Sequence, residues 1–216
     1  MRPLTLEKPK PLLEVGGQTI LERIINALPQ EISELIVVVG YLKDKIQDFL
    51  GRKFRGLKIH YVFQPEKTGT GHALQLCRPI LLAGEKFLVL TADDLRDKRD
   101  LENLCAQTYA LGVQEVLNPE CFGVVIMDNK NRVMGFEEKP AHPRSNLVST
   151  GAIVLDSRVF NYEPARHPNG EYYLVSMVEQ MLKDHAIYGV KELGWIPIGY
   201  PEDLLKAEKI LQHAQR

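Results

Sequence analysis

Short apolar runs that predict buried strands alternate with amphipathic segments through the first half of this chain. Residues 35–39 read Leu-Ile-Val-Val-Val, and such a continuous β-branched run is typical of a strand covered on both faces. Residues 57–63 and 87–91 predict two further strands. Apolar residues recur at helical spacing in three other segments, namely residues 20–28, 42–50 and 73–81. The alternation predicts an α/β fold: a Rossmann-like, doubly wound, mostly parallel sheet in three α/β/α layers.

The pattern changes after about residue 112, where strands become closely spaced. Four predicted strands are separated by turn signals, namely residues 113–116, 123–127, 132–138 and 151–155. The polar run 128–131 between two of them predicts a hairpin turn. A helix near 172–183, a strand near 186–190 and a helix after Pro201 are expected to close the chain. We therefore expect a mixed-sheet extension of one domain that covers residues 1–216.

Charge and cysteine usage exclude several classes of protein. The net charge of −1 gives no overall attraction to nucleic acid or to an anionic membrane. No apolar run is long enough to span a bilayer, so no membrane partner is expected. The three cysteines have no C-x-x-C spacing and the six histidines are scattered, which disfavours a zinc site. These features predict a cytoplasmic protein with reduced thiols.

Two adjacent carboxylates, Asp93 and Asp94, follow the strand predicted over residues 87–91. Ligands of open α/β sheets bind at the carboxyl ends of strands. Paired carboxylates in such a place suit Mg²⁺, which prefers oxygen ligands and shares them with substrate phosphates. Alternatively, one of the two only caps a helix that starts near residues 97–101. The spacing alone does not decide between these interpretations.

Three other segments carry weaker signals. Residues 64–73 place glycines before a predicted helix, where backbone N–H groups can approach an anion or a planar ring. Lys10 lies between two prolines that stiffen the backbone, which suits a fixed charge beside polyphosphate. Residues 137–140, Glu-Glu-Lys-Pro, form a polar turn after a strand. Neither a Walker A loop nor a G-x-G-x-x-G is present, which argues against ATPases and dinucleotide-binding proteins.

Taken in order, these segments resemble the sugar-phosphate nucleotidylyltransferases, and most closely the short glucose-1-phosphate thymidylyltransferase branch. The resemblance covers essentially the whole chain. Each motif is modest, but the ordered set is specific. Its members are Met1 to Thr5, Lys8 to Leu13, Gln64 with Gly69 and His72-Ala73, Asp93, Phe122 to Val125, Glu138 to Pro140, Ser145 to Leu147, Thr150-Gly151, Gly170 to Tyr172, and Trp195 to Gly199.

The resemblance implies a reaction and a role for each matched residue. A nucleoside triphosphate and a sugar 1-phosphate would give an NDP-sugar and pyrophosphate, with Mg²⁺ as cofactor. The implied catalytic residues are Lys10, Asp93 and Lys139, with Asp93 as the metal ligand. The implied nucleotide-binding residues are Arg2, Lys10, Gln64, Gly69 and Thr70. The implied sugar-binding residues are Gly123, Glu138, Lys139 and Thr150. A homo-oligomer is compatible with this family, and the base and sugar are left open.

Two departures from the family pattern favour an alternative. The family's first strand and its Gly-Thr-Arg loop precede the matched region, so we expect Met1 to be an internal methionine and two strands to lack a neighbour. The family's Trp-x-Asp-x-Gly, whose Asp is a second metal ligand, has Pro197 at the Asp position. A catalytically impaired nucleotide-sugar-binding or regulatory homologue is therefore the second hypothesis. A plain Rossmann-like module for another ligand is the third.

These departures also predict how the 216-residue chain behaves. Since the absent loop would hold the triphosphate, we expect the chain to bind an NDP-sugar better than a free triphosphate. We also expect it to release pyrophosphate slowly or not at all.

Overall fold

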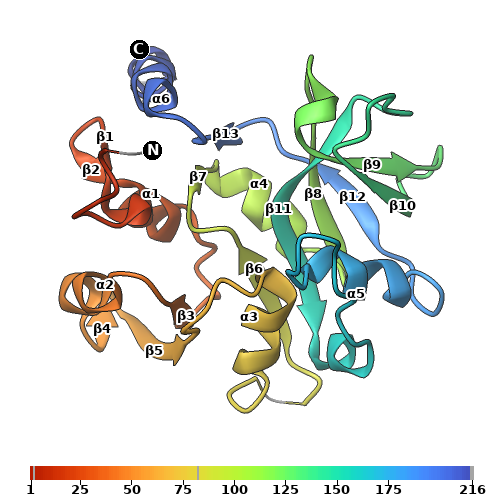
Figure 1. Ribbon diagram of the computed structural model, residues 1–216, viewed down its shortest axis with the longest axis horizontal. Helices are drawn as coiled ribbons and strands as arrows, with labels where there is room; N and C mark the ends of the chain where they lie inside the picture. Colours follow the sequence, from red (N-terminus) through yellow and green to blue (C-terminus); the bar gives the residue numbers. More distant parts are fainter. Residues whose placement is uncertain (2, 82, 215–216) are drawn as a thin grey trace.

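The computed structural model describes residues 1, 3–81 and 83–214, and it has an α/β architecture (Figure 1). A small sheet contains β3 (Glu34–Val39), β5 (Leu57–Phe63) and β4 (Lys53–Phe54). β3 runs parallel to β5, and β4 runs antiparallel to it. α1 (Ile20–Ala27) and α2 (Lys43–Leu50) pack against this sheet through one apolar cluster. α1 begins with a capping box in which the side chains of Thr19 and Glu22 each accept from the other's backbone N–H.

The larger sheet has six strands in the order β10-β9-β11-β8-β12, with β6 paired to β11. β12 runs parallel to β8, and the other neighbours are antiparallel. The bounds are β6 (Lys86–Leu90), β8 (Ala110–Glu115), β9 (Gly123–Met127), β10 (Val133–Glu138), β11 (Leu147–Asp156) and β12 (Tyr188–Lys191).

Helices cover both faces of this sheet and complete three layers. On one face, α3 (Thr70–Cys77), α5 (Leu174–Met181) and η3 (Ser157–Asn161) pack into the largest apolar cluster. On the other face, α4 (Lys98–Cys105) and the end of α1 pack into a second cluster. β6 serves both clusters, because Phe87 and Val89 point to the first and Leu88 and Leu90 to the second.

The remaining elements are short, except for the last helix. They are η1 (Lys10–Leu12), the hairpin of β1 (Glu14–Val15) and β2 (Gln18–Thr19), η2 (Pro119–Cys121), the pair of β7 (Asp94–Leu95) and β13 (Ile196–Pro197), and α6 (Pro201–Ala214). No helix among the described residues is both long enough and apolar enough to cross a membrane.

The α/β, Rossmann-like class, the mixed-sheet extension and the predicted strands and helices are confirmed, with ends shifted by a few residues. The share of parallel pairing is smaller than predicted. Within the described part of the chain only β3 with β5 and β8 with β12 pair in parallel. The reason is that β3 and β6 do not pair with one another, and that β11 runs antiparallel to β6.

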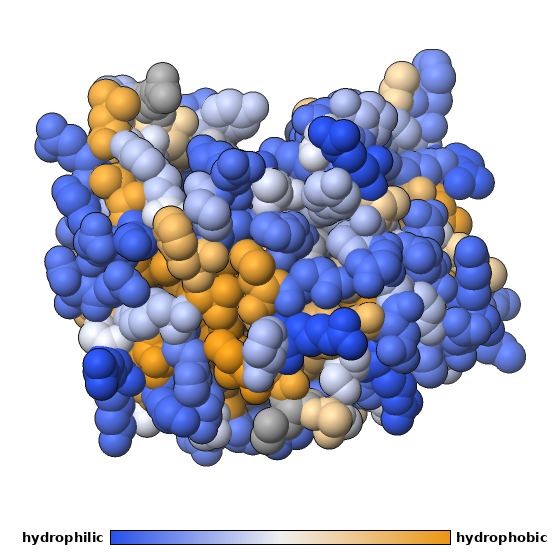
Figure 2. Space-filling model, turned by 60° about the horizontal axis from the view of Figure 1, so that its bottom comes forward, coloured by the Kyte–Doolittle hydropathy of each residue, from blue (hydrophilic) through white to orange (hydrophobic). Residues whose placement is uncertain are grey.

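β3 and β6 each have an open edge. Among the described residues β3 pairs with β5 alone and β6 with β11 alone. Most residues of both strands are only half-buried, although their sequences are apolar. Half-buried apolar side chains therefore contribute to the surface, and Figure 2 shows a broad apolar area on one face of the molecule. An open, apolar strand edge is a template for further strand pairing.

Candidate active site

A cavity of about 430 Å³ lies where β6 ends and brings together elements from both halves of the chain. η1, α3, β9, β10, β11 and the segment around β13 all contribute to its walls. Six residues that the sequence predicted for the site line it, namely Lys10, Thr70, Asp93, Gly123, Glu138 and Thr150. Arg2, also predicted for the site, lies outside the described residues.

Lys10 and Asp93 meet in this cavity as an ion pair. The Lys10 Nζ atom lies 2.8 Å from Asp93 Oδ2, although 83 residues separate the two in sequence. Pro9 and Pro11 flank Lys10, which begins the short helix η1. The Asp93 side chain is 43% exposed, so its carboxylate is open to an incoming group. An ammonium and a carboxylate side by side at a cavity wall can hold a phosphate and a cation.

The structure separates the roles of Asp93 and Asp94. Asp97, rather than either of them, caps α4 by accepting from Arg99 N. Asp94 Oδ2 accepts a hydrogen bond from Trp195 Nε1 at 3.0 Å, and Oδ1 accepts one from Ile198 N at 3.2 Å. Burial, with the negative charge of Asp93 beside it, raises the pKa of Asp94 above its usual value. Asp94 therefore anchors the chain around β13, and Asp93 is the accessible carboxylate.

β9, β10 and β11 form the opposite wall of the cavity, with Gly123, Glu138 and Thr150. A Cβ on Gly123 would lie 3.4 Å from Glu138 Oε2, so a larger residue would press on that carboxylate. Lys139 is not among the lining residues. Its side chain is 64% exposed, and its Nζ lies 4.0 Å from Glu138 Oε1. Lys139 thus lies beside the cavity, next to the lining residue Glu138.

Gln64 and Gly69 are brought together at the start of α3. Gln64 Nε2 donates to Gly69 O at 3.1 Å, and Gly69 has a φ of +98° that favours glycine. Two backbone hydrogen bonds of 2.8 Å tie this loop to Tyr172, from Gly71 N to Tyr172 O and from Tyr172 N to Thr68 O. Gln64 lines a second hollow of about 520 Å³ at the carboxyl ends of β3 and β5, rather than the main cavity.

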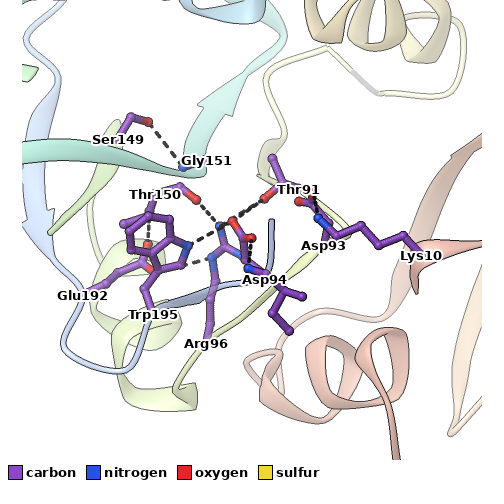
Figure 3. A network of polar contacts seen from close by, with 11 residues as sticks. Lys10, Thr91, Asp93, Asp94, Arg96, Ser149, Thr150, Gly151, Glu192 and Trp195 are labelled. Carbon is purple, nitrogen blue, oxygen red and sulfur yellow. Dashed lines mark hydrogen bonds and ion pairs between the residues drawn. The ribbon is translucent and has the colours of Figure 1, made fainter. Parts of the chain in front are cut away.

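A polar network behind the cavity was not predicted from the sequence. Figure 3 shows that Arg96 contacts Thr91, Thr150 and Asp94, and that Glu192 contacts Thr150 and Arg96. Neither Arg96 nor Glu192 lies in a recognisable motif. The only signal in the sequence was a charged residue close to each of two predicted strand ends, and that is a common arrangement.

The burial of Glu192 gives a pH-dependent prediction. Burial raises its pKa above the ordinary 4.5, although Arg96 and Thr150 act in the opposite direction. The folded state therefore holds this proton more tightly than the unfolded state does. The stability that it contributes is present at low pH and is lost as pH rises through the raised pKa.

Glu192→Gln should therefore gain stability relative to the parent chain as pH rises from about 4 to about 8. Urea unfolding of both chains at several pH values measures this difference in the free energy of unfolding. A difference that stays constant, or that moves in the opposite direction, would contradict the burial argument.

The described residues offer few protein ligands for a metal ion. No three His, Cys, Asp or Glu side chains converge in the described part of the chain. Pro197 lines the cavity, and its side chain has no ligand atom. Asp93 is accessible, whereas both Asp94 oxygens accept hydrogen bonds from protein groups. Mg²⁺ is commonly held by one or two carboxylates with phosphate and water, so Asp93 fits such an ion as its single protein ligand.

Comparison with known proteins places the chain in a family. The nucleotidyl transferase family model matches residues 1–214. The chain belongs to the nucleotidyl transferase family. It is 34% identical to the bifunctional protein GlmU of Methanocaldococcus jannaschii over 98% of this chain and 51% of that protein. It is 30% identical to the UTP–glucose-1-phosphate uridylyltransferase AglF of Haloferax volcanii, over 98% of this chain and 91% of that one.

Two solved structures of other proteins share the fold of this chain. A putative glucose-1-phosphate thymidylyltransferase from Bacillus anthracis, in complex with sucrose, superposes with a TM-score of 0.85 at 26% identity. That match covers 97% of this chain and 89% of the other. A UDP-glucose pyrophosphorylase complexed with UDP-glucose has a TM-score of 0.84 at 20% identity, covering 100% and 94%, and it shows the shared fold. The chain spans about half the length of the first curated relatives that it matches.

Proposed function

We propose that this nucleotidyl transferase joins a sugar 1-phosphate to the nucleotidyl part of a nucleoside triphosphate, giving an NDP-sugar and pyrophosphate. The observation that carries the proposal is the Lys10–Asp93 pair, which shares one cavity with Glu138 and Thr150. Relatives named as sugar-phosphate nucleotidyltransferases support the same reaction class. We regard residues 1–216 as one nucleotidyltransferase-like domain. We place it in the cytoplasm, where free cysteines such as its three are the rule.

The arrangement suits a reaction between two anions. An oxygen of the sugar phosphate forms the new bond to the α-phosphorus, and the bond from that phosphorus to the pyrophosphate oxygen breaks. The nucleophile is already charged, so no Ser or Cys nucleophile is needed. The protein must position both substrates and offset charge. In this proposal Lys10 exchanges Asp93 for a phosphate oxygen, Lys139 contacts the sugar phosphate, and Glu138 accepts from sugar hydroxyls.

Mg²⁺ belongs to the proposal as a cofactor. Asp93 would hold it, and the ion would supply positive charge to the phosphates when bound. Because Asp94 is occupied by Trp195 and Ile198 and Pro197 offers no ligand atom, affinity for the metal should depend on bound nucleotide. Gln64, Gly69 and the loop before α3 are proposed to contact the base.

Lys139→Ala tests the sugar-phosphate contact. Loss of a charge-assisted hydrogen bond typically costs about 1.5–3 kcal/mol, so NDP-sugar binding should weaken roughly tenfold to a hundredfold. The fold should remain intact because the side chain is mostly exposed. Calorimetric titration measures the change. Lys130→Ala is the matched control, since Lys130 is an exposed lysine at the other end of the β9–β10 hairpin. Equal binding by both variants would show that Lys139 is misassigned.

The second candidate is a binding or regulatory homologue, and Pro197 in the cavity wall favours it. Pyrophosphate release from each of the four common triphosphates, with a panel of sugar 1-phosphates, separates the two. Release that requires one matched pair of substrates supports the enzyme. Silence with every pair, while an NDP-sugar still binds, supports the binding homologue.

A further inference from the structure

Arg96 and Glu192 form a fully buried ion pair that no part of the proposed reaction uses. Arg96 Nε lies 3.4 Å from Glu192 Oε2, and the two side chains are 1% and 0% exposed. Neither residue lines the cavity. Figure 3 shows the pair next to Thr91, Asp94 and Thr150, which do line it. The pair can therefore act on a bound ligand only through its neighbours.

The neighbour that it holds most closely is Thr150. Thr150 Oγ1 donates to Glu192 Oε1 at 2.7 Å, and the Thr150 carbonyl accepts from Arg96 Nη2. The pairing of β11 with β8 is interrupted between Ser149 and Ile153. Thr150 lies inside this interruption, so side-chain contacts replace regular ladder bonds there. The position of Thr150 in the cavity wall thus depends on the buried pair.

The same pair also reaches the end of β6, which pairs with β11. Arg96 Nη2 donates to Thr91 Oγ1 at 3.3 Å, and Thr91 lies at the end of β6, two residues before Asp93. Gly112 on β8 leaves the space that the network occupies. A Cβ there would lie 1.9 Å from Glu192 Oε1 and 2.4 Å from Thr150 Oγ1. A residue with a side chain at position 112 would therefore collide with the network.

Several polar atoms of the pair lack a hydrogen-bond partner. Within the described residues, Arg96 Nε, Arg96 Nη1 and Glu192 Oε2 make no hydrogen bond that meets ordinary geometry. Buried ion pairs of this kind add little to stability compared with well-packed apolar residues. Stability alone is thus a weak reason for this arrangement, whereas its contacts with Thr91 and Thr150 give it a specific effect on the cavity.

We propose that Arg96 and Glu192 are positioning residues that fix Thr150 in the sugar part of the cavity and thereby set affinity for the sugar. This inference rests on the proposed function. Thr150 is buried and its hydroxyl is engaged by Glu192, so the pair acts by fixing the backbone of Thr150 between Ser149 and Gly151, which also line the cavity. The loop that contains Gln64 and Gly69 makes its contacts with Tyr172 instead. The pair should therefore affect the sugar and leave the nucleotide largely unaffected.

Glu192→Gln tests this split. Calorimetry is run with two matched pairs of probes, UDP-glucose with UDP and dTDP-glucose with dTDP. The quantity compared is the ratio of the affinity for the glucose nucleotide to the affinity for the matching diphosphate, taken for the base that the parent chain binds. Glu192→Gln should reduce this ratio about tenfold, with affinity for the bare diphosphate unchanged. Arg96→Lys, which keeps the charge but loses the planar fork, should reduce it in the same direction.

Asp156→Asn is the matched control. Asp156 is a buried carboxylate that accepts from Tyr109 and pairs with Arg158 at 3.7 Å, and none of the three lines the cavity. It should lower stability without changing this affinity ratio. An equal loss for sugar nucleotide and bare diphosphate in both network variants would overturn the positioning role and leave the proposed function standing. Failure of the parent chain to bind these two sugar nucleotides, or any other in a panel of NDP-sugars, would overturn both.

Discussion

Asp93→Asn should reduce pyrophosphate release by about a hundredfold or more in any active form of this protein. The substitution keeps the size of the side chain but removes the one accessible carboxylate that faces Lys10 across 2.8 Å. An amide neither pairs with the ammonium nor holds Mg²⁺ as a carboxylate does. Loss of a single electrostatic contact to the reacting phosphates typically costs about 10²–10³ in rate. Steady-state pyrophosphate release at saturating Mg²⁺ measures the effect.

Asp94→Asn is the informative comparison for this experiment. Its partners are Trp195 and Ile198, so the variant should lose stability, which thermal unfolding measures, while its turnover below the melting temperature falls much less. Near-normal turnover of Asp93→Asn, together with loss of turnover in Asp94→Asn, would move the metal and phosphate assignment by one residue.

Gly69→Ala should abolish measurable nucleotide binding. The new Cβ would lie 2.4 Å from Tyr172 O and 2.7 Å from Tyr172 N, and the φ of +98° disfavours any side chain. The loop must move away from Tyr172, so the hydrogen bonds from Gly71 N to Tyr172 O and from Tyr172 N to Thr68 O are lost. Backbone strain of this kind costs about 1–3 kcal/mol before the lost bonds are counted. Titration with a nucleoside diphosphate and urea unfolding together measure both consequences.

Gly56→Ala separates the clash from the strain. Gly56 has a comparable φ of +92°, and a Cβ there meets nothing within 4 Å. It should lose stability by a similar amount from strain while binding nucleotide as the parent does. Retained nucleotide binding in Gly69→Ala would show that the loop before α3 is not part of the nucleotide site.

The sequence located the strands well because continuous β-branched runs and turn residues are local signals. The run over residues 35–39 became β3, and the carboxylates after residue 91 were correctly placed at the end of a strand. The ordered motifs also identified six residues that the fold gathers into one cavity. This worked because the strand-end residues of an α/β sheet meet at one edge, whatever their distance in sequence.

Other features depended on contacts that no local pattern encodes. Whether Asp93 or Asp94 stays accessible was decided by Trp195, which lies 101 residues beyond Asp94 and takes one of its oxygens. Arg96 follows β7 and Glu192 follows β12, which pairs with β8, so the two become neighbours only in the folded protein. The sequence by itself determined which strands and helices form and which chemical groups reach the sheet edge. Only the tertiary structure decided which of those groups are engaged by protein partners, because burial and hydrogen bonding across elements control which atoms remain free for a ligand.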